Sequence, residues 1–92
     1  MTGRAQTLRQ RMQVRGVVQG VGFRPFVFRL ARRLDLAGWV RNTSWGVELE
    51  VQGPRTALSD FARTLQEQAP PLARIESVSV EDVPPDSQQQ SG

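Results

Sequence analysis

Apolar and polar residues alternate near the start of the chain in a way that predicts a strand and then a helix. In Gln10–Val18, Met12 and Val14 alternate with arginine and glutamine, which is the period of a half-buried strand. After a glycine-rich stretch, Pro25 suits the first position of a helix, and Gly38 is expected to end it. This helix has an apolar side, formed by Phe26, Val27, Leu30, Ala31 and Leu34. Its other side is basic and is expected to face solvent, with Arg29, Arg32 and Arg33.

Two strands joined by a turn are expected next. Trp39–Arg41 is the first of them, with Trp39 in the core, and Asn42–Gly46 has the composition of a turn. In the strand that follows, valine and leucine alternate with Glu48 and Glu50, the pattern of a strand with one buried face.

The rest of the chain predicts one more helix and one more strand. The helix opens at Gly53-Pro54 and ends before Pro70-Pro71, and the last strand precedes Pro84. The apolar positions behind these assignments are Leu58, Phe61, Ala62 and Leu65 for the helix and Ile75, Val78 and Val80 for the strand. The order βαββαβ predicts an α+β fold, the ferredoxin-like sandwich, in which an antiparallel sheet carries both helices on one face.

Length and composition predict a single domain within the 92 residues. Residues 10–85 are expected to form it. Residues 1–9 are polar and without period, so they are interpreted as a flexible leader. Residues 86–92 contain no apolar residue, which indicates a disordered tail or linker.

The sequence has no cysteine, histidine or tyrosine. Disulfides, nucleophilic cysteines, serine–histidine dyads and the usual zinc ligand sets are therefore excluded. We expect neither metal nor cofactor, and chemistry that relies on arginine, amides, carboxylates, hydroxyls or the backbone.

Positive charge is concentrated in the first half of the chain. The formal net charge is +3, and Asp35 is the only acidic residue between Arg4 and Arg41. Such a segment suits an anionic ligand, whether a small phosphate, a nucleic acid or a membrane surface. No apolar run reaches membrane-spanning length and no signal-peptide core follows Met1, so a cytoplasmic protein without membrane contact is expected.

The glycine loop, Gln19–Arg24, is the strongest candidate site. Gly20 and Gly22 permit backbone conformations that turn successive N–H groups inward, and the loop leads into a helix N-terminus, which favours a phosphate. Arg24 at this junction can offer a bidentate fork to phosphate oxygens. The alternative is that the glycines only make a turn and that Arg24 is solvated. The loop is neither a Walker loop nor a dinucleotide fingerprint.

Two blocks of the chain, Gly16–Arg24 and Gly38–Thr43, resemble the acylphosphatase family. Gly16–Arg24 is similar to the signature Gly-x-Val-Gln-Gly-Val-x-Phe-Arg, Gly38–Thr43 to the Gly-Trp-Val-x-Asn-Thr block, and Val51–Pro54 is a weaker third match. The resemblance implies hydrolysis of a carboxylic–phosphoric anhydride, with Asn42 orienting water and inorganic phosphate as product or inhibitor. By the same resemblance Arg24 and the N–H groups of six residues hold the phosphoryl group: Gln19, Gly20, Val21, Gly22, Phe23 and Arg24.

A finer resemblance concerns Phe23–Val27 and Pro70–Ile75. These segments look like the acylphosphatase-like domain that begins the hydrogenase-maturation carbamoyltransferase. This implies carbamoyl phosphate as a substrate and the remaining domains of a larger enzyme as partners. The family usually ends in a further short strand, which residues 86–92 are not expected to supply.

Three alternatives stay open at this stage. A ferredoxin-like module that binds phosphate without turnover would keep the glycine loop. An RNA-binding module would stack bases on strand aromatics, but Phe23, Phe26 and Phe28 lie at the first helix, so no nucleic acid is expected. Without the resemblance, Asn42 would be an ordinary turn residue.

Overall fold

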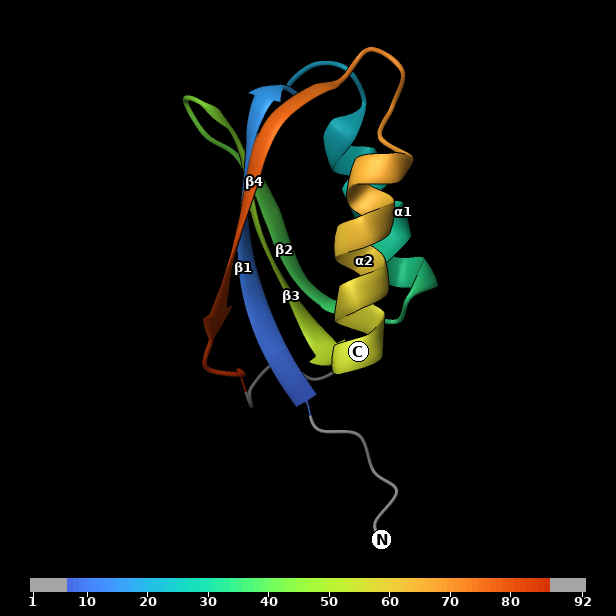
Figure 1. The fold of residues 1–92 in the computed structure, drawn as a ribbon, viewed down its shortest axis with the longest axis vertical. Coiled ribbons are helices and arrows are strands. Elements are labelled where there is room, and N and C mark those ends of the chain that lie inside the picture. Colours follow the sequence, from blue (N-terminus) through green and yellow to red (C-terminus); the bar gives the residue numbers. More distant parts are fainter. Residues whose placement is uncertain (1–6, 87–92) are drawn as a thin grey trace, which may run out of the picture.

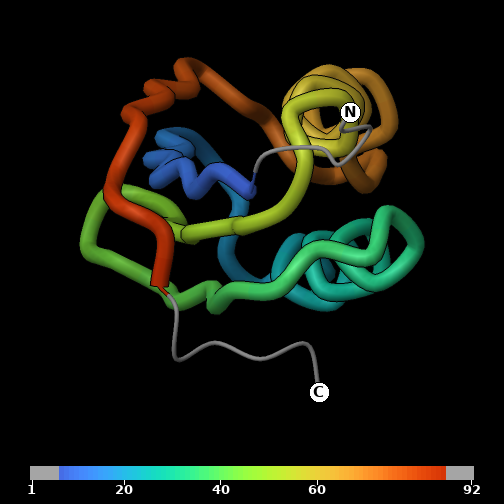
Figure 2. Tube along the Cα trace, turned by 90° about the horizontal axis from the view of Figure 1, so that it is seen from below, coloured from blue at the N-terminus to red at the C-terminus, as the bar shows by residue number. Residues whose placement is uncertain are grey.

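The computed structural model describes residues 7–86 and contains six elements in the expected order (Figure 1). They are β1 (Thr7–Val17), α1 (Phe23–Arg33), β2 (Ala37–Asn42), β3 (Gly46–Pro54), α2 (Arg55–Glu67) and β4 (Arg74–Val83). The strands form one antiparallel sheet in the order β2-β3-β1-β4. Figure 2 shows the two helices end-on, next to each other on one side of the strands. The predicted ferredoxin-like sandwich is confirmed.

The core lies between the sheet and the helices, as the alternation of apolar residues predicts. Met12 and Val14 of β1 are buried there, and the odd-numbered residues of β1 point to the open face of the sheet. The other members of this core are Val18, Val47, Leu49 and Val51 around the sheet, Phe23, Val27, Leu30 and Leu36 in or near α1, and Leu58, Phe61 and Leu65 in α2. Within residues 7–86 no helix is long and apolar enough to cross a membrane.

The first helix begins and ends at residues other than those predicted. It starts at Phe23, so Pro25 is its third residue, where a missing N–H still costs no hydrogen bond. Gly38 does not end it. Asp35 adopts the left-handed conformation, with φ 59°, and the N–H of Leu36 donates to the carbonyl of Ala31 at 2.8 Å, as in a Schellman motif.

Gly38 instead lies inside β2, where it has a packing role. A Cβ atom at this position would lie 1.8 Å from the carbonyl oxygen of Glu50. Glycine therefore allows β2 and β3 to approach closely.

The open face of the sheet carries an ion-pair network that covers the glutamates of β3. Glu48 and Glu50 have only 8% and 7% of their surface exposed, although they alternate with the core residues as predicted. Arg9 Nε donates to Glu50 at 2.6 Å, Arg11 Nε donates to its other oxygen at 2.9 Å, and Arg41 pairs with Glu48 at 2.6 Å. Opposite charges on neighbouring strands stabilise their pairing.

Two opposing effects act on the carboxyl group of Glu50. Burial raises its pKa, but the hydrogen bonds from Arg9 and Arg11 outweigh this, so the pKa lies below its ordinary value. Glu50 is therefore charged at neutral pH in spite of its burial.

Trp39 and the ends of the domain differ from the predictions. Trp39 lies outside the core, with 38% of its surface exposed on the open face. β1 begins at Thr7, so residues 7–9 belong to a strand rather than to a flexible leader. Asp86, expected to start a disordered tail, exchanges two backbone hydrogen bonds with the side chain of Gln52. Residues 1–6 and 87–92 lie outside the described part of the chain.

Candidate active site

Two residues of the glycine loop adopt left-handed backbone conformations. Gly20 and Gly22 have φ angles of 74° and 83°, in the left-handed region that other residues rarely occupy. An added Cβ atom at either glycine would meet nothing within 4 Å. The backbone angle, and not crowding, therefore requires glycine here, and the space around the loop is open to a ligand.

The N-terminus of α1 has no side-chain cap. Gly22 occupies the cap position, and no acidic residue lies in the first turn. Phe26 N–H bonds to the carbonyl of Gly22 at 3.2 Å, while the amides of Phe23 and Arg24 precede the first intrahelical bonds. An uncapped helix end with the positive end of its dipole directed at the loop is suited to an anion.

The side chain of Gln19 joins the glycine loop to the turn between β2 and β3. Its Nε2 donates to the carbonyl of Gly46 at 2.8 Å and also to the carbonyl of Thr43. The sequence pattern predicts only a backbone role for Gln19 and does not reveal this side-chain contact. The available signal is that Gln19 carries the only side-chain amide of the loop.

Asn42 is the last residue of β2 and stands at the base of this turn. It pairs with Val47 of β3, and its side chain is exposed. Arg24 is likewise exposed, at the second position of α1. Within residues 7–86 neither side chain makes a hydrogen bond or ion pair, so both can turn toward a ligand. The Oγ1 atom of the adjacent Thr43 is buried and has no hydrogen-bond partner among these residues.

A shallow hollow of about 270 Å³ lies beside the glycine loop. Its walls are Gly16–Gln19 and Ser44–Gly46, and neither Arg24 nor Asn42 lines it. Trp45 is half-buried in this wall, with the guanidinium carbon of Arg15 5.0 Å from its ring centre. The volume is close to the lower limit of small-ligand pockets, about 300 Å³. The hollow therefore adjoins the predicted site without containing all of it.

The structure thus brings the loop and the turn that follows β2 together through Gln19. The part of the chain that the structure describes has no cluster of three or more acidic, histidine or cysteine side chains placed to hold a metal. The chemical groups at the site are backbone amides, the guanidinium of Arg24 and the side-chain amides of Gln19 and Asn42.

Comparison with known proteins places this site in context. The family model described as Acylphosphatase matches residues 10–91. The carbamoyltransferase HypF2 of Cupriavidus necator is 58% identical over 76 residues, which are 83% of this chain and 9% of that protein. The acylphosphatase of Salinibacter ruber is 51% identical over 70 residues, 75% of this chain and 73% of that protein.

A solved structure shows the same fold. The crystal structure of full-length HypF in the phosphate- and nucleotide-bound form superposes with a TM-score of 0.89 at 38% identity, over 94% of this chain and 12% of that one. The chain thus spans about a tenth of the carbamoyltransferases and most of the acylphosphatase.

Proposed function

Because the chain belongs to the acylphosphatase family, we propose that it hydrolyses an acyl phosphate or carbamoyl phosphate to inorganic phosphate and a carboxylate or carbamate. The observation that carries this proposal is the left-handed conformation of Gly20 and Gly22 at the uncapped end of α1. The acylphosphatase-named relatives, such as that of Salinibacter ruber, support an enzyme rather than a passive module.

In this proposal the glycine loop holds the phosphoryl group. The amide groups from Gln19 to Arg24 and the guanidinium of Arg24 donate hydrogen bonds to its oxygens. Phosphoryl transfer needs positioning and charge stabilisation more than covalent chemistry, and these donors supply both. Arg24 forms no ion pair within residues 7–86, so no internal carboxylate competes with the substrate.

Asn42 orients the attacking water. Its side-chain carbonyl oxygen can accept a hydrogen bond from the water and leave the water oxygen directed at phosphorus. The carboxylate that departs is stable as an anion, so no general acid is needed, and the substrate phosphate accepts the water's proton. The chain has no histidine, and this route requires none.

The likeness to HypF proteins favours carbamoyl phosphate among these substrates. We propose that the chain acts as the first domain of a carbamoyltransferase used in hydrogenase maturation and delivers carbamate to the remaining domains. A cytoplasmic location and the absence of nucleic-acid or membrane contact stay predictions from the sequence.

The test is a metal-free assay of the purified protein with benzoyl phosphate and carbamoyl phosphate. We expect phosphate release from both, with competitive inhibition by inorganic phosphate. The second candidate, a module that binds phosphate without turnover, rests on the same loop geometry. Saturable phosphate binding without any turnover would favour that module and contradict hydrolysis.

A further inference from the structure

The hollow beside the glycine loop is larger than a carbamoyl group needs. It measures about 270 Å³ and is lined in part by Gln19, the first residue of the loop. A chemical group joined to a phosphoryl group in the loop can therefore extend into the hollow. A carbamoyl group has one carbon, one oxygen and one nitrogen, and even a water molecule in the liquid takes up about 30 Å³. Carbamoyl phosphate would thus leave most of the hollow unfilled.

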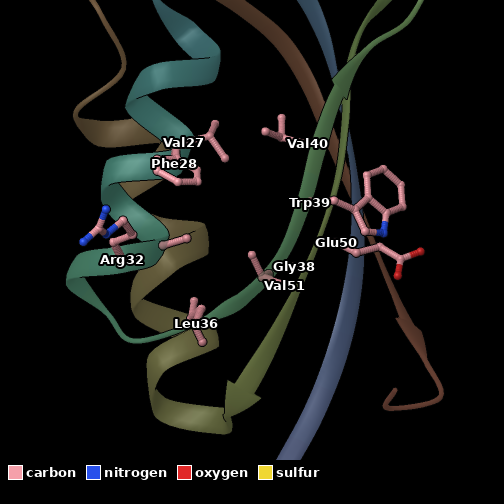
Figure 3. Close-up of a pocket in the computed structure, with 10 residues that line it drawn as sticks. Val27, Phe28, Arg32, Leu36, Gly38, Trp39, Val40, Glu50 and Val51 are labelled. Carbon is pink, nitrogen blue, oxygen red and sulfur yellow. The ribbon is translucent and has the colours of Figure 1, made fainter. Parts of the chain in front are cut away.

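A second cavity does not adjoin the loop. It lies between α1 and β2, has a volume of about 70 Å³, and is lined by side chains such as Val27 and Val40 (Figure 3). Figure 3 also shows Trp39 and Glu50 projecting from the other side of the strands, which is the open face of the sheet. Arg15 of β1 points to this same open face, at the end of the strand that leads into the glycine loop.

The hollow beside the loop has apolar walls and a basic rim. Val17 is 52% exposed and Trp45 is half-buried, and both line it. The guanidinium carbon of Arg15 lies 5.0 Å from the centre of the Trp45 ring, which is a cation–π contact. This contact holds the exposed guanidinium beside the hollow without neutralising its charge.

Arg15 differs from the two arginines that precede it in β1. Arg9 and Arg11 both form ion pairs with Glu50. The residues opposite Arg15 on the neighbouring strands are a glycine and a serine, which offer no carboxylate. Within residues 7–86 Arg15 makes no ion pair. Its charge is therefore available to an anionic group of a ligand in the hollow.

We propose that the hollow is an acyl subsite that selects acyl phosphates with a carboxylate at the far end of the acyl chain, such as succinyl phosphate. This inference rests on the proposed hydrolysis and names a substrate class for it. The methylene groups of the chain lie against Val17 and Trp45, and the terminal carboxylate accepts hydrogen bonds from Arg15.

The reaction itself is the one proposed above. Water attacks phosphorus, the bond between phosphorus and the bridging oxygen breaks, and its electron pair leaves with the acyl group as a carboxylate. The products are a dicarboxylate and inorganic phosphate, which keeps the proton of the water. Arg15 and Trp45 thus determine which acyl group is accepted and take no part in the bond changes.

Size and charge together limit the ligand. The volume is close to the lower limit of small-ligand pockets, about 300 Å³, and admits a short chain rather than a peptide or an oligonucleotide. No charged side chain of residues 7–86 lines the hollow itself, so Arg15 at the rim is the group that meets a terminal carboxylate. An acyl chain ending in a methyl group would gain nothing from Arg15.

The experiment compares hydrolysis of succinyl phosphate and butyryl phosphate by the 92-residue protein. Both acyl chains have the same number of carbons, and only their ends differ. We expect kcat/KM to be about fivefold higher for succinyl phosphate, because an exposed arginine and a carboxylate attract each other modestly. Equal values for the two substrates would overturn the proposal.

Variants separate Arg15 from general positive charge. Arg15→Gln should lower kcat/KM for succinyl phosphate to the value for butyryl phosphate. The matched control is Arg74→Gln, an exposed arginine paired with Val17 across the strands and without an ion pair within residues 7–86, which should keep the preference. A preference that survives in Arg15→Gln, or is lost equally in both variants, would refute the role of Arg15.

The apolar wall has its own test. Trp45→Ala should lower kcat/KM for butyryl phosphate more than for carbamoyl phosphate, because only the longer chain reaches the ring. An equal loss for both substrates would contradict the acyl subsite. Thermal unfolding of each variant shows whether the fold is retained.

Binding measurements keep this inference separable from hydrolysis. The keto-phosphonates of the two substrates, in which a methylene group replaces the bridging oxygen, cannot be hydrolysed. In calorimetric titration the succinyl analogue should bind about fivefold more tightly than the butyryl analogue, and Arg15→Gln should remove the difference. That result without turnover of any acyl phosphate would retain the subsite and refute hydrolysis. Turnover of all acyl phosphates at one rate would retain hydrolysis and refute the subsite.

Discussion

The side-chain amide of Gln19 donates to the carbonyl of Gly46 at 2.8 Å and thereby fastens the glycine loop to the turn between β2 and β3. The proposed phosphate ligand, Arg24, follows the loop, and the proposed water-orienting residue, Asn42, precedes the turn. The relative placement of these two groups therefore depends on a side chain that belongs to neither role.

Removing the side-chain amide of Gln19 should lower kcat strongly and the free energy of unfolding only slightly. For Gln19→Ala we expect kcat to fall about tenfold or more, since small misplacements of reacting groups are costly. The free energy of unfolding should fall by only about 1–2 kcal/mol. The control is Gln13→Ala, which removes a side-chain bond to Glu48 on the open face. An equal loss of kcat in both variants would contradict the positioning role.

Removal of the Arg24 guanidinium should abolish phosphate binding. Charge-assisted hydrogen bonds contribute roughly 1.5–3 kcal/mol each. Arg24→Ala should therefore lower the affinity for inorganic phosphate at least about 100-fold in a calorimetric titration. Arg24→Lys retains the charge without the bidentate fork, so its affinity for phosphate should lie between those of the parent and of Arg24→Ala. Arg33→Ala, at an exposed position of the same helix, is the control. Unchanged phosphate affinity in Arg24→Ala would refute the assignment.

Asn42→Ala should separate binding from catalysis. We expect phosphate affinity within about threefold of the parent and kcat lowered about 100-fold, because the variant loses the orientation of water but no phosphate ligand. Steady-state kinetics with benzoyl phosphate measures this, and Ser44→Ala, an exposed turn residue, serves as the comparison. A fully active Asn42→Ala protein would exclude the water-orienting role.

Glu50→Gln should destabilise the protein in a pH-dependent manner. The folded-state pKa of Glu50 is lowered, so its stabilising effect is complete above the ordinary value of 4.5 and is lost as pH falls through the folded value. At pH 7 we expect a loss of about 3 kcal/mol, because Arg9 loses a buried ion pair. Chemical denaturation should show that the free energies of unfolding of Glu50→Gln and the parent differ less below pH 4.5 than at pH 7. A constant difference would contradict the ion-pair origin.

The matched variant Glu48→Gln should lower the free energy of unfolding by less than Glu50→Gln does. Its partner Arg41 has 67% of its side chain exposed, and such pairs contribute about 1 kcal/mol or less.

Gly38→Ala should unfold the β2 edge or the whole domain. The new methyl would lie 1.8 Å from the backbone carbonyl of Glu50, so the strands must separate. We expect a loss of about 3 kcal/mol or more in thermal unfolding, against about 1–2 kcal/mol for Gly20→Ala, where space is open and only the backbone angle is unfavourable. Equal losses would show that close packing at Gly38 is unimportant.

The fold was predictable because local patterns decided it. Met12 and Val14 alternate with polar residues as the sheet requires, and Gly20 and Gly22 of the loop have the left-handed backbone angles that glycine permits. The end of α1 was not predictable from composition, because Asp35 takes the left-handed position that glycine usually occupies.

Features that depend on strand register could not be predicted from the sequence. The sequence pattern predicts Trp39 in the core, but pairing of β2 with β3 places it opposite Glu50 on the open face. The same register brings Arg11 beside Glu50 and buries the glutamate. The side-chain bonds of Gln19 likewise join segments 24 and 27 residues apart, which no local pattern reveals.

The hydrogen bonds between Gln52 and Asp86 have a practical consequence for how this domain can be immobilised on a surface or fused to another protein. Gln52 pairs with Arg9 near the start of β1, whereas the glycine loop follows the end of that strand (Figure 1). At about 3.3 Å per residue, the length of β1 between Arg9 and Gly16 separates these places by about 23 Å. Thr7 and Asp86 thus leave from one pole of the molecule, and immobilisation or fusion through either would leave the opposite pole facing dissolved substrate.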